Sequence, residues 1–161
     1  MANAVAGTQS IETKRDAART RERGRAQRRR RQDKRVSELT RREVGLVGED
    51  IATAEYERQG IEVYARNWRS HFGEADIIAL DGSTAILCEV KTRVVYDPND
   101  PPIPELAVGP AKQDRYRKMA CEFIATYRNI EEVRFDVMGI DLMDGREPMV
   151  TFLPNAFGWD E

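Results

Sequence analysis

The sequence predicts an α/β domain in which a mixed β-sheet is flanked by helices. Two segments have the 3.6-residue hydrophobic spacing of helices, and five shorter segments have the alternating or continuous apolar pattern of strands. Their order along the chain is α-β-β-β-α-β-β, which suits a mixed sheet between helices. With 161 residues, the chain is long enough for one domain with a hydrophobic core.

The ends of both helices carry sequence signals. The first helix is expected to begin at Ser37 or Thr40, and Glu43 follows Thr40 at the spacing of a capping box. Gly60 suits the position just beyond the last turn of that helix. Pro110 opens the second helix, "PAKQDRYRKMACEFIATYR", because proline is favoured at the first helical position.

Five segments are expected to form strands, and turn residues separate them. In chain order the strands are "IEVYARNW", "GEADIIAL", "TAILCEVK", "VRFDVMGIDL" and "PMVTFL". "DGS" predicts a hairpin between the second and third, whereas "VVYDPNDPPIPELAVG" contains four of the seven prolines and predicts a loop. Arg134 and Asp136 lie two residues apart on one face of the fourth strand, where an ion pair is expected.

The charges are divided unevenly along the chain. Residues 1–35 contain 12 Lys and Arg against 4 Asp and Glu, whereas the remaining residues contain 14 against 24. Because residues 1–36 hold few aliphatic side chains, we expect a disordered basic tail there and one folded domain over residues 37–161. Such a tail either contacts nucleic acid or keeps the protein soluble, and the sequence leaves both functions open.

Composition argues against several classes of protein. No segment approaches the roughly 20 apolar residues of a membrane span, and the first residues lack the apolar core of a secretory signal. The cysteines, Cys88 and Cys121, form no CxxC motif, which argues against a zinc site or a disulfide framework. We therefore expect a cytoplasmic protein with no membrane partner.

Two charges interrupt the apolar strand "ILCEVKTR", residues 86–93. Because successive residues of a strand point to opposite faces, Glu89 and Lys91 should share one face, and Cys88 and Val90 the other. Burying a carboxylate costs several kcal/mol unless it is paired or binds a cation. Glu89 therefore needs a partner.

The hairpin before this strand predicts which side chain faces Glu89. If residues 81–84 form a four-residue loop, Asp76 faces Glu89 and Glu74 faces Lys91. Directly opposed residues have Cβ atoms about 4.5–5.5 Å apart, so two carboxylates there repel unless one is protonated or a cation intervenes. Mg²⁺ suits such a pair. The alternative is a cross-strand salt-bridge ladder of these four residues on a solvated face.

Five motifs occur together in a fixed order: "RREVGLVGEDIA", "NWRSHFGEADIIALDG", "CEVKTR", "AKQDRYRK" and "RFDVMGI". In this combination, over residues 40–140, the chain resembles the bacterial UPF0102 (YraN-like) family. That family is similar to the PD-(D/E)xK nuclease superfamily, particularly the Holliday-junction resolvases and restriction-type endonucleases. The resemblance implies a restriction-endonuclease-like core.

The resemblance also implies a catalytic site. Asp76 and Glu89 would be its metal-binding acids, Lys91 its catalytic lysine, and Glu49 an additional metal-binding acid from the first helix. The implied cofactor is Mg²⁺ or Mn²⁺. Ala75 stands where the superfamily has a proline before the aspartate, a departure that is common in this branch.

Five further residues are candidates for contacts with nucleic acid. Lys112 and Gln113 open the second helix, where backbone N–H groups favour phosphate. Arg66, Arg69 and Arg93 flank the strand ends, where they would reach a DNA backbone. Ordinary solvated surface residues would give the same pattern at each of these positions.

The leading functional hypothesis is a metal-dependent endonuclease that hydrolyses phosphodiester bonds of branched or single-stranded DNA. The alternative is a nucleic-acid-binding module, for DNA or for ribosome-associated RNA, that keeps the fold without turnover. A homodimer remains open, because resolvases cut paired strands as dimers.

Overall fold

A computed structural model describes residues 24, 26–29, 34–97, 99, 108–127 and 129–159. In chain order its elements are the short 3-10 helix η1 (Val36–Glu38), then α2 (Arg41–Arg58), β1 (Glu62–Ser70), β2 (Gly73–Asp81), β3 (Thr84–Val94), α3 (Pro110–Thr126), β4 (Glu132–Leu142) and β5 (Met149–Phe157). The predicted order of helices and strands is confirmed, with η1 added before α2.

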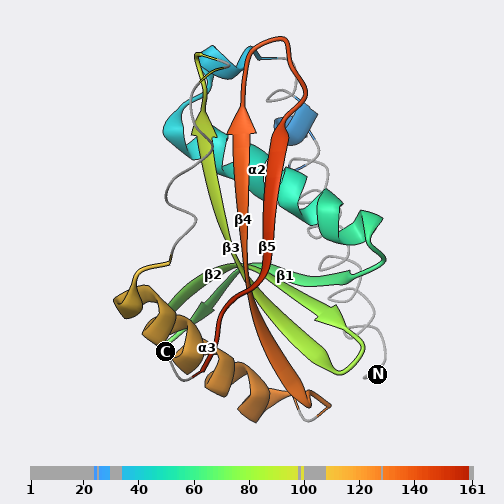
Figure 1. Ribbon diagram of the computed structural model, residues 1–161. Coiled ribbons are helices and arrows are strands. Elements are labelled where there is room, and N and C mark those ends of the chain that lie inside the picture. The colour runs from blue at the N-terminus through green and yellow to red at the C-terminus, as the bar shows by residue number, and fades with distance from the viewer. Residues whose placement is uncertain are drawn as a thin grey trace, which may run out of the picture.

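The sheet has the strand order β1-β2-β3-β4-β5. Only β3 and β4 run parallel, and the other neighbouring strands are antiparallel. The parallel pair follows from the chain path. Helix α3 lies between β3 and β4 in the sequence and returns the chain to the end of the sheet where β3 begins (Figure 1). The predicted mixed sheet flanked by helices is therefore confirmed.

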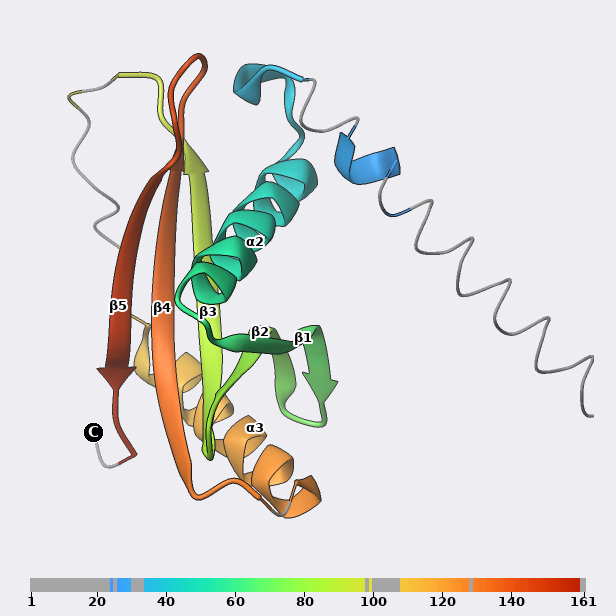
Figure 2. The ribbon, with the colours of Figure 1, turned by 90° about the vertical axis from the view of Figure 1, so that its right-hand side faces the viewer.

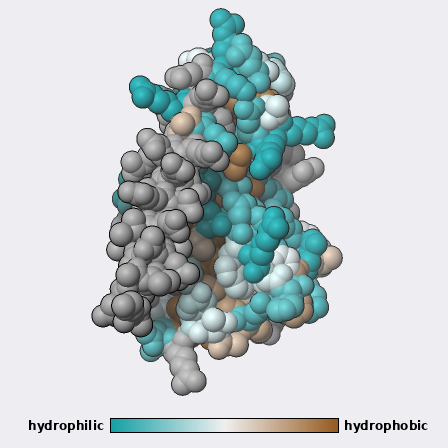
Figure 3. Space-filling model, turned by 180° about the vertical axis from the view of Figure 1, so that it is seen from behind, coloured by the Kyte–Doolittle hydropathy of each residue, from teal (hydrophilic) through white to brown (hydrophobic). Residues whose placement is uncertain are grey.

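The two long helices cover opposite faces of the sheet (Figures 1 and 2). Tyr116 and Phe123 of α3 pack with Leu87 of β3 in one core. Ala52 and Tyr56 of α2 pack in the other core, which also contains Ile86 and Cys88 of β3. Seen from behind, the surface is mostly hydrophilic, and hydrophobic residues are visible in a hollow near its middle (Figure 3).

The predicted helix signals are confirmed at the described ends. Thr40 caps α2 in a capping box with Glu43, and the helix ends just before Gly60, which has a φ of +79°. Pro110 is the first residue of α3. Local sequence therefore determines where both helices begin and where α2 ends.

The hairpin between β2 and β3 is tighter than predicted. Asp81 pairs with Thr84, so the loop has only Gly82 and Ser83 instead of four residues. Gly82 has a φ of +61°, which the turn requires and which glycine adopts without strain. The register next to the turn is still the one that a four-residue loop predicts, because either loop places Leu80 opposite Ala85.

Two predictions concern segments that lie largely outside the described residues: the disordered tail over residues 1–36 and the proline-rich loop. Where the tail is described, it contacts α2. Arg28 lies 2.8 Å from Asp50, and Lys34 lies 2.6 Å from Glu43. Among the described residues, no helix is long and apolar enough to cross a membrane.

Candidate functional site

Glu89 lies in the middle of β3 and is only 6% exposed. Nζ of Lys112 donates a hydrogen bond to its Oε1, and the hydroxyl of Tyr116 donates to its Oε2 at 2.8 Å. Both donors belong to α3. The alternative of a solvated cross-strand ladder does not fit, because Glu89 is buried and its partners come from a helix.

β3 sends alternate residues to its two faces, as the sequence predicts. Leu87 packs in the core beneath α3, whereas Cys88 and Val90 pack in the core beneath α2. Since Glu89 bonds to α3, the alternation places Lys91 farther along that same face. Lys91 is half-buried and interacts with neighbouring groups.

Asp76 lies where β2 separates from β3. The ladder between these strands ends with Ile77 opposite Cys88, so Asp76 is not the direct ladder partner of Glu89 that the register predicts. Instead, Oδ2 of Asp76 accepts a hydrogen bond of 2.8 Å from the backbone N–H of Val90. The carboxylate of Asp76 is thereby fixed to the strand position next to Glu89.

The second predicted facing pair, Glu74 with Lys91, is wrong. Glu74 is the ladder partner of Arg69 on β1, and Nε of Arg69 lies 3.0 Å from its carboxylate. The reason is that β2 leaves β3 beyond Ile77 while it stays paired with β1. Extrapolating the hairpin register therefore fails past the point of separation.

Helix α2 crosses β3 next to Glu49. A Cβ atom on Gly48 would stand 1.7 Å from Oγ1 of Thr92, so only glycine allows this approach. The carboxylate of Glu49 accepts hydrogen bonds from Nη2 of Arg66 at 3.0 Å and from Nδ2 of Asn67 at 2.8 Å. These contacts fix the helix acid against both β3 and β1.

Arg66 links Glu49 to the strand that carries Asp76. In the ladder between β1 and β2, Arg66 pairs with Ile77, the residue that follows Asp76. Its guanidinium also lies 2.6 Å from Asp50, so it bridges two neighbouring carboxylates of α2. The structure thus brings Asp76, Glu89 and Glu49 to one region from three elements.

The pKa of Asp76 is raised by burial and, in part, because the other two acids lie near it. Burial is the main cause that raises it from its ordinary value to about 7, and the negative charges of Glu89 and Glu49 raise it further. The N–H of Val90 and the ammonium of Lys112 act in the opposite direction. A proton on Asp76 therefore stabilises the fold.

We expect Asp76→Asn to stabilise the metal-free protein. A carboxyl whose pKa rises on folding loses stability as the pH increases from about 4 to about 7, and the amide avoids that loss. After allowance for partial exposure, the gain in the free energy of unfolding should be about 1–3 kcal/mol at pH 8 and smaller at pH 5. Denaturant unfolding at both pH values with a chelator measures it; an equal effect at both would contradict this assignment.

The donor types of the three acids fit a hard divalent cation, because Mg²⁺ and Mn²⁺ prefer carboxylate oxygens. The side chains are not arranged as a metal site in this structure. Among the described residues, no three His, Cys, Asp or Glu side chains converge closely enough to hold a metal ion. Lys112 neutralises Glu89 in this arrangement.

The other predicted nucleic-acid contacts are distributed over the molecule, and that role stays a prediction for each. Gln113 donates to the backbone carbonyl of Val108 at 2.9 Å. Arg93 forms a two-pronged ion pair with Asp141, at 2.8 and 3.1 Å. Arg69 is largely exposed beside its partner carboxylate, whereas Lys112 and Arg66 are both engaged with acids of the site.

Two residues that hold the acids were not predicted. Tyr116 is buried, and its pKa is raised by burial and by the negative charge of Glu89, which keeps the phenol a hydrogen-bond donor. Asn67 adopts a φ of +51° and donates to Glu49. One signal was available, because Lys112 and Tyr116 are four residues apart and face the same side of a helix.

A second buried acid, Asp136 on β4, belongs to the core. Arg134 lies 2.9 Å from it, which confirms the predicted ion pair. The hydroxyl of Tyr56 and the backbone N–H of Asn155 also donate to it, at 2.8 and 2.9 Å. Since both of its oxygens are occupied, Asp136 stabilises the packing of α2 and β5 on β4.

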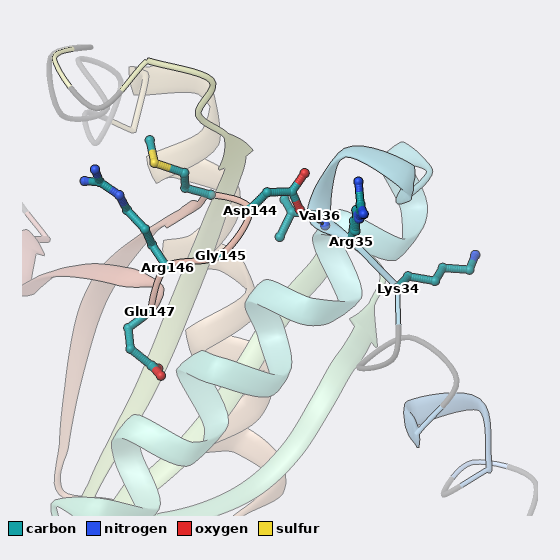
Figure 4. Close-up of a pocket in the computed structure, with 8 residues that line it drawn as sticks. Lys34, Arg35, Val36, Asp144, Gly145, Arg146 and Glu147 are labelled. Atoms are coloured by element: carbon teal, nitrogen blue, oxygen red, sulfur yellow. Dashed lines mark hydrogen bonds between the residues drawn. The ribbon is translucent and has the colours of Figure 1, made fainter.

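An open pocket of about 770 Å³ lies at the turn between β4 and β5, against residues 34–36. Asp144 points toward Val36 and accepts hydrogen bonds from its backbone N–H and from that of Ser37 (Figure 4). Arg146 and Glu147 point away from this contact (Figure 4). The pocket therefore has no convergent set of reactive groups.

Comparison with known proteins identifies relatives that match most of the chain. The model of the uncharacterised protein family UPF0102 matches residues 48–140, which include all three acids and Lys91. A UPF0102 protein of Bifidobacterium longum is 39% identical over 123 residues, covering 74% of this chain and 96% of the relative. One from Geobacter metallireducens is 38% identical over 122 residues, covering 74% and 95%. This chain is a member of the UPF0102 family.

Proposed function

We propose that this protein is a metal-dependent endonuclease that hydrolyses phosphodiester bonds of DNA. The observation that carries the proposal is the hydrogen bond from Val90 to Asp76, which fixes one acid beside Glu89 at the point where β2 and β3 separate. Arg66 ties Glu49 to the same point. Acids from a helix and from two strands, one of which also carries a lysine, suit phosphodiester hydrolysis.

Each residue of the site has a proposed role. Asp76, Glu89 and Glu49 would hold Mg²⁺ or Mn²⁺, which when bound supplies charge neutralisation and Lewis-acid activation. Lys91 would stabilise the negative charge that develops on the attacked phosphate. Arg66 and Tyr116 orient Glu49 and Glu89, respectively.

A nucleic-acid-binding module without turnover is the second candidate. It is favoured by the ion pair between Lys112 and Glu89, because a protein side chain there neutralises the most buried acid of the site. The two candidates differ in one respect: a binding module does not require a divalent cation, and its affinity for nucleic acid should not depend on Asp76.

The deciding experiment is a cleavage assay on linear duplex, single-stranded, flap and four-way-junction DNA with Mg²⁺ or Mn²⁺. We expect cleavage of at least one branched or single-stranded substrate, loss of cleavage in Lys91→Ala, and a saturable heat of either sign on metal titration by calorimetry. Binding of DNA with no cleavage and no metal binding would reject the endonuclease and favour the binding module.

We also expect removal of residues 1–33 to weaken DNA binding and to flatten its dependence on salt. The segment is rich in arginine, and each lost phosphate contact lowers the slope of log affinity against log salt by about 0.7–0.9. Thermal stability should change little, because the described contact that is lost, Arg28 with Asp50, is a surface pair worth about 0–1 kcal/mol. Unchanged affinity at low salt would show that the tail has no role in binding.

A further inference from the structure

An exposed aromatic ring stands next to the acidic site. Phe72, in the turn between β1 and β2, is 44% exposed. It lines a hollow of about 160 Å³ together with Lys112, Arg115 and Tyr116 of α3. Lys112 and Tyr116 are the two residues that bond to Glu89, so this hollow adjoins the site.

Phe72 also borders a second, mainly apolar hollow of about 620 Å³. This hollow is lined by Lys118 and Cys121 of α3 and by Trp159. Trp159 is 43% exposed, and its ring packs edge-on against Phe135, with 5.4 Å between the centroids. The two hollows, with the exposed rings of Phe72 and Trp159, therefore form a track that leads away from the acidic site.

The turn that carries Phe72 is held in place. The carboxylate of Glu122 on α3 accepts a hydrogen bond from the backbone N–H of His71 at 3.3 Å and lies 3.2 Å from its ring nitrogen. The N–H of Phe72 donates to Oγ of Ser70 at 3.0 Å. The backbone that carries the exposed ring is thus held in place before a ligand binds. Binding therefore costs little conformational entropy in this turn.

Basic side chains lie along the track, together with some acids. Lys112, Arg115 and Lys118 line the two hollows, and so do Glu74 and Glu122. Lys112 is paired with Glu89 and Lys118 with Asp114. Arg115 is exposed and forms no ion pair with any other described residue. Basic side chains beside exposed aromatic rings are the combination that binds single-stranded nucleic acid, because phosphates meet the charges while bases stack on the rings.

We propose that Phe72 and Trp159 form a stacking platform for unpaired bases of a DNA strand that enters the acidic site along α3. This inference rests on the proposed function and specifies its substrate class: DNA with single-stranded character on one side of the scissile phosphate. A base-paired strand cannot use the platform, because its base faces are already stacked within the duplex.

The test measures binding of a fluorescent single-stranded oligonucleotide by anisotropy, with a chelator present so that cleavage does not interfere. Phe72→Ala should weaken binding about 5- to 100-fold, the loss of one stacked base. Phe72→Leu keeps the apolar volume without the ring face and should lose a similar factor. Duplex binding should be unaffected by either change.

Two matched controls isolate stacking. An oligonucleotide that lacks bases at successive positions should bind the wild type more weakly, and Phe72→Ala should weaken it no further. Tyr96→Ala removes an aromatic residue that is 79% exposed, lies just beyond the end of β3 and lines neither hollow. That variant should bind like the wild type.

Several results would overturn the platform: no loss in Phe72→Ala, an equal loss on the abasic oligonucleotide, or self-association of the protein that Phe72→Ala abolishes. The last would identify the hollow as an interface between copies. Cleavage that is insensitive to Phe72 would reject the platform alone. Base-dependent binding through Phe72 in a protein that cleaves nothing with Mg²⁺ or Mn²⁺ would keep the platform and reject the endonuclease.

Discussion

Asp76→Asn should reduce Mg²⁺-dependent DNA cleavage by at least about 100-fold, because even residues that merely orient metal ligands contribute up to that factor. Asparagine can still accept the hydrogen bond from Val90, so the strand geometry should be kept. The variant loses the charge that a divalent cation requires. Single-turnover cleavage of the preferred substrate measures the effect.

The matched control is Asp81→Asn, the same chemical change at the exposed end of the same strand. It should cleave at the wild-type rate. Comparable activity in Asp76→Asn and Asp81→Asn would mean that Asp76 takes no part in the reaction. A variant that retains metal-dependent thermal stabilisation while losing cleavage would show that the remaining acids still hold the cation.

Gly48→Ala should destabilise the protein by at least about 2–3 kcal/mol. Overpacking a core usually costs about 1–3 kcal/mol, and here the new Cβ would lie 1.7 Å from Oγ1 and 2.8 Å from Cβ of Thr92. The helix propensity of alanine offers only about 1 kcal/mol in compensation. Because α2 must move away from β3, Glu49 should shift as well, and cleavage should fall.

The double variant Gly48→Ala with Thr92→Ala tests the cause. It removes the closest atom but not Cβ of residue 92, so the free energy of unfolding should recover in part. The control is Gly45→Ala, on the same helix, where a Cβ meets no atom within 4 Å. That change should be neutral or stabilising; a large loss there would show that backbone effects, not contact with Thr92, dominate.

Local rules explain which features of the site could be predicted. Alternation along β3 places Glu89 and Lys91 on one face, and the hairpin register brings Asp76 close to Glu89 without information about the rest of the chain. The capping box at Thr40 likewise depends on residues three positions apart. These features depend on sequence separations of a few residues or on one short turn.

Long-range packing decides the features that could not be predicted. The ion pair of Lys112 with Glu89 depends on how α3 lies across the sheet. The hydrogen bond from Arg66 to Glu49 depends on how closely α2 approaches β1. The separation of β2 from β3 beyond Ile77 is a further example, because the twist of the sheet does not appear in a one-dimensional pattern.

The hydrogen bond from Val90 to Asp76 supplies a natural spectroscopic probe of the site. An amide proton that is bonded to a carboxylate resonates at a frequency that follows the charge of that carboxylate. The Val90 signal in a nitrogen-correlated NMR spectrum should therefore titrate with Asp76, although the peptide group itself has no pKa in this range. The same signal should move when a divalent cation is added, so occupancy of the site can be followed without DNA and without turnover.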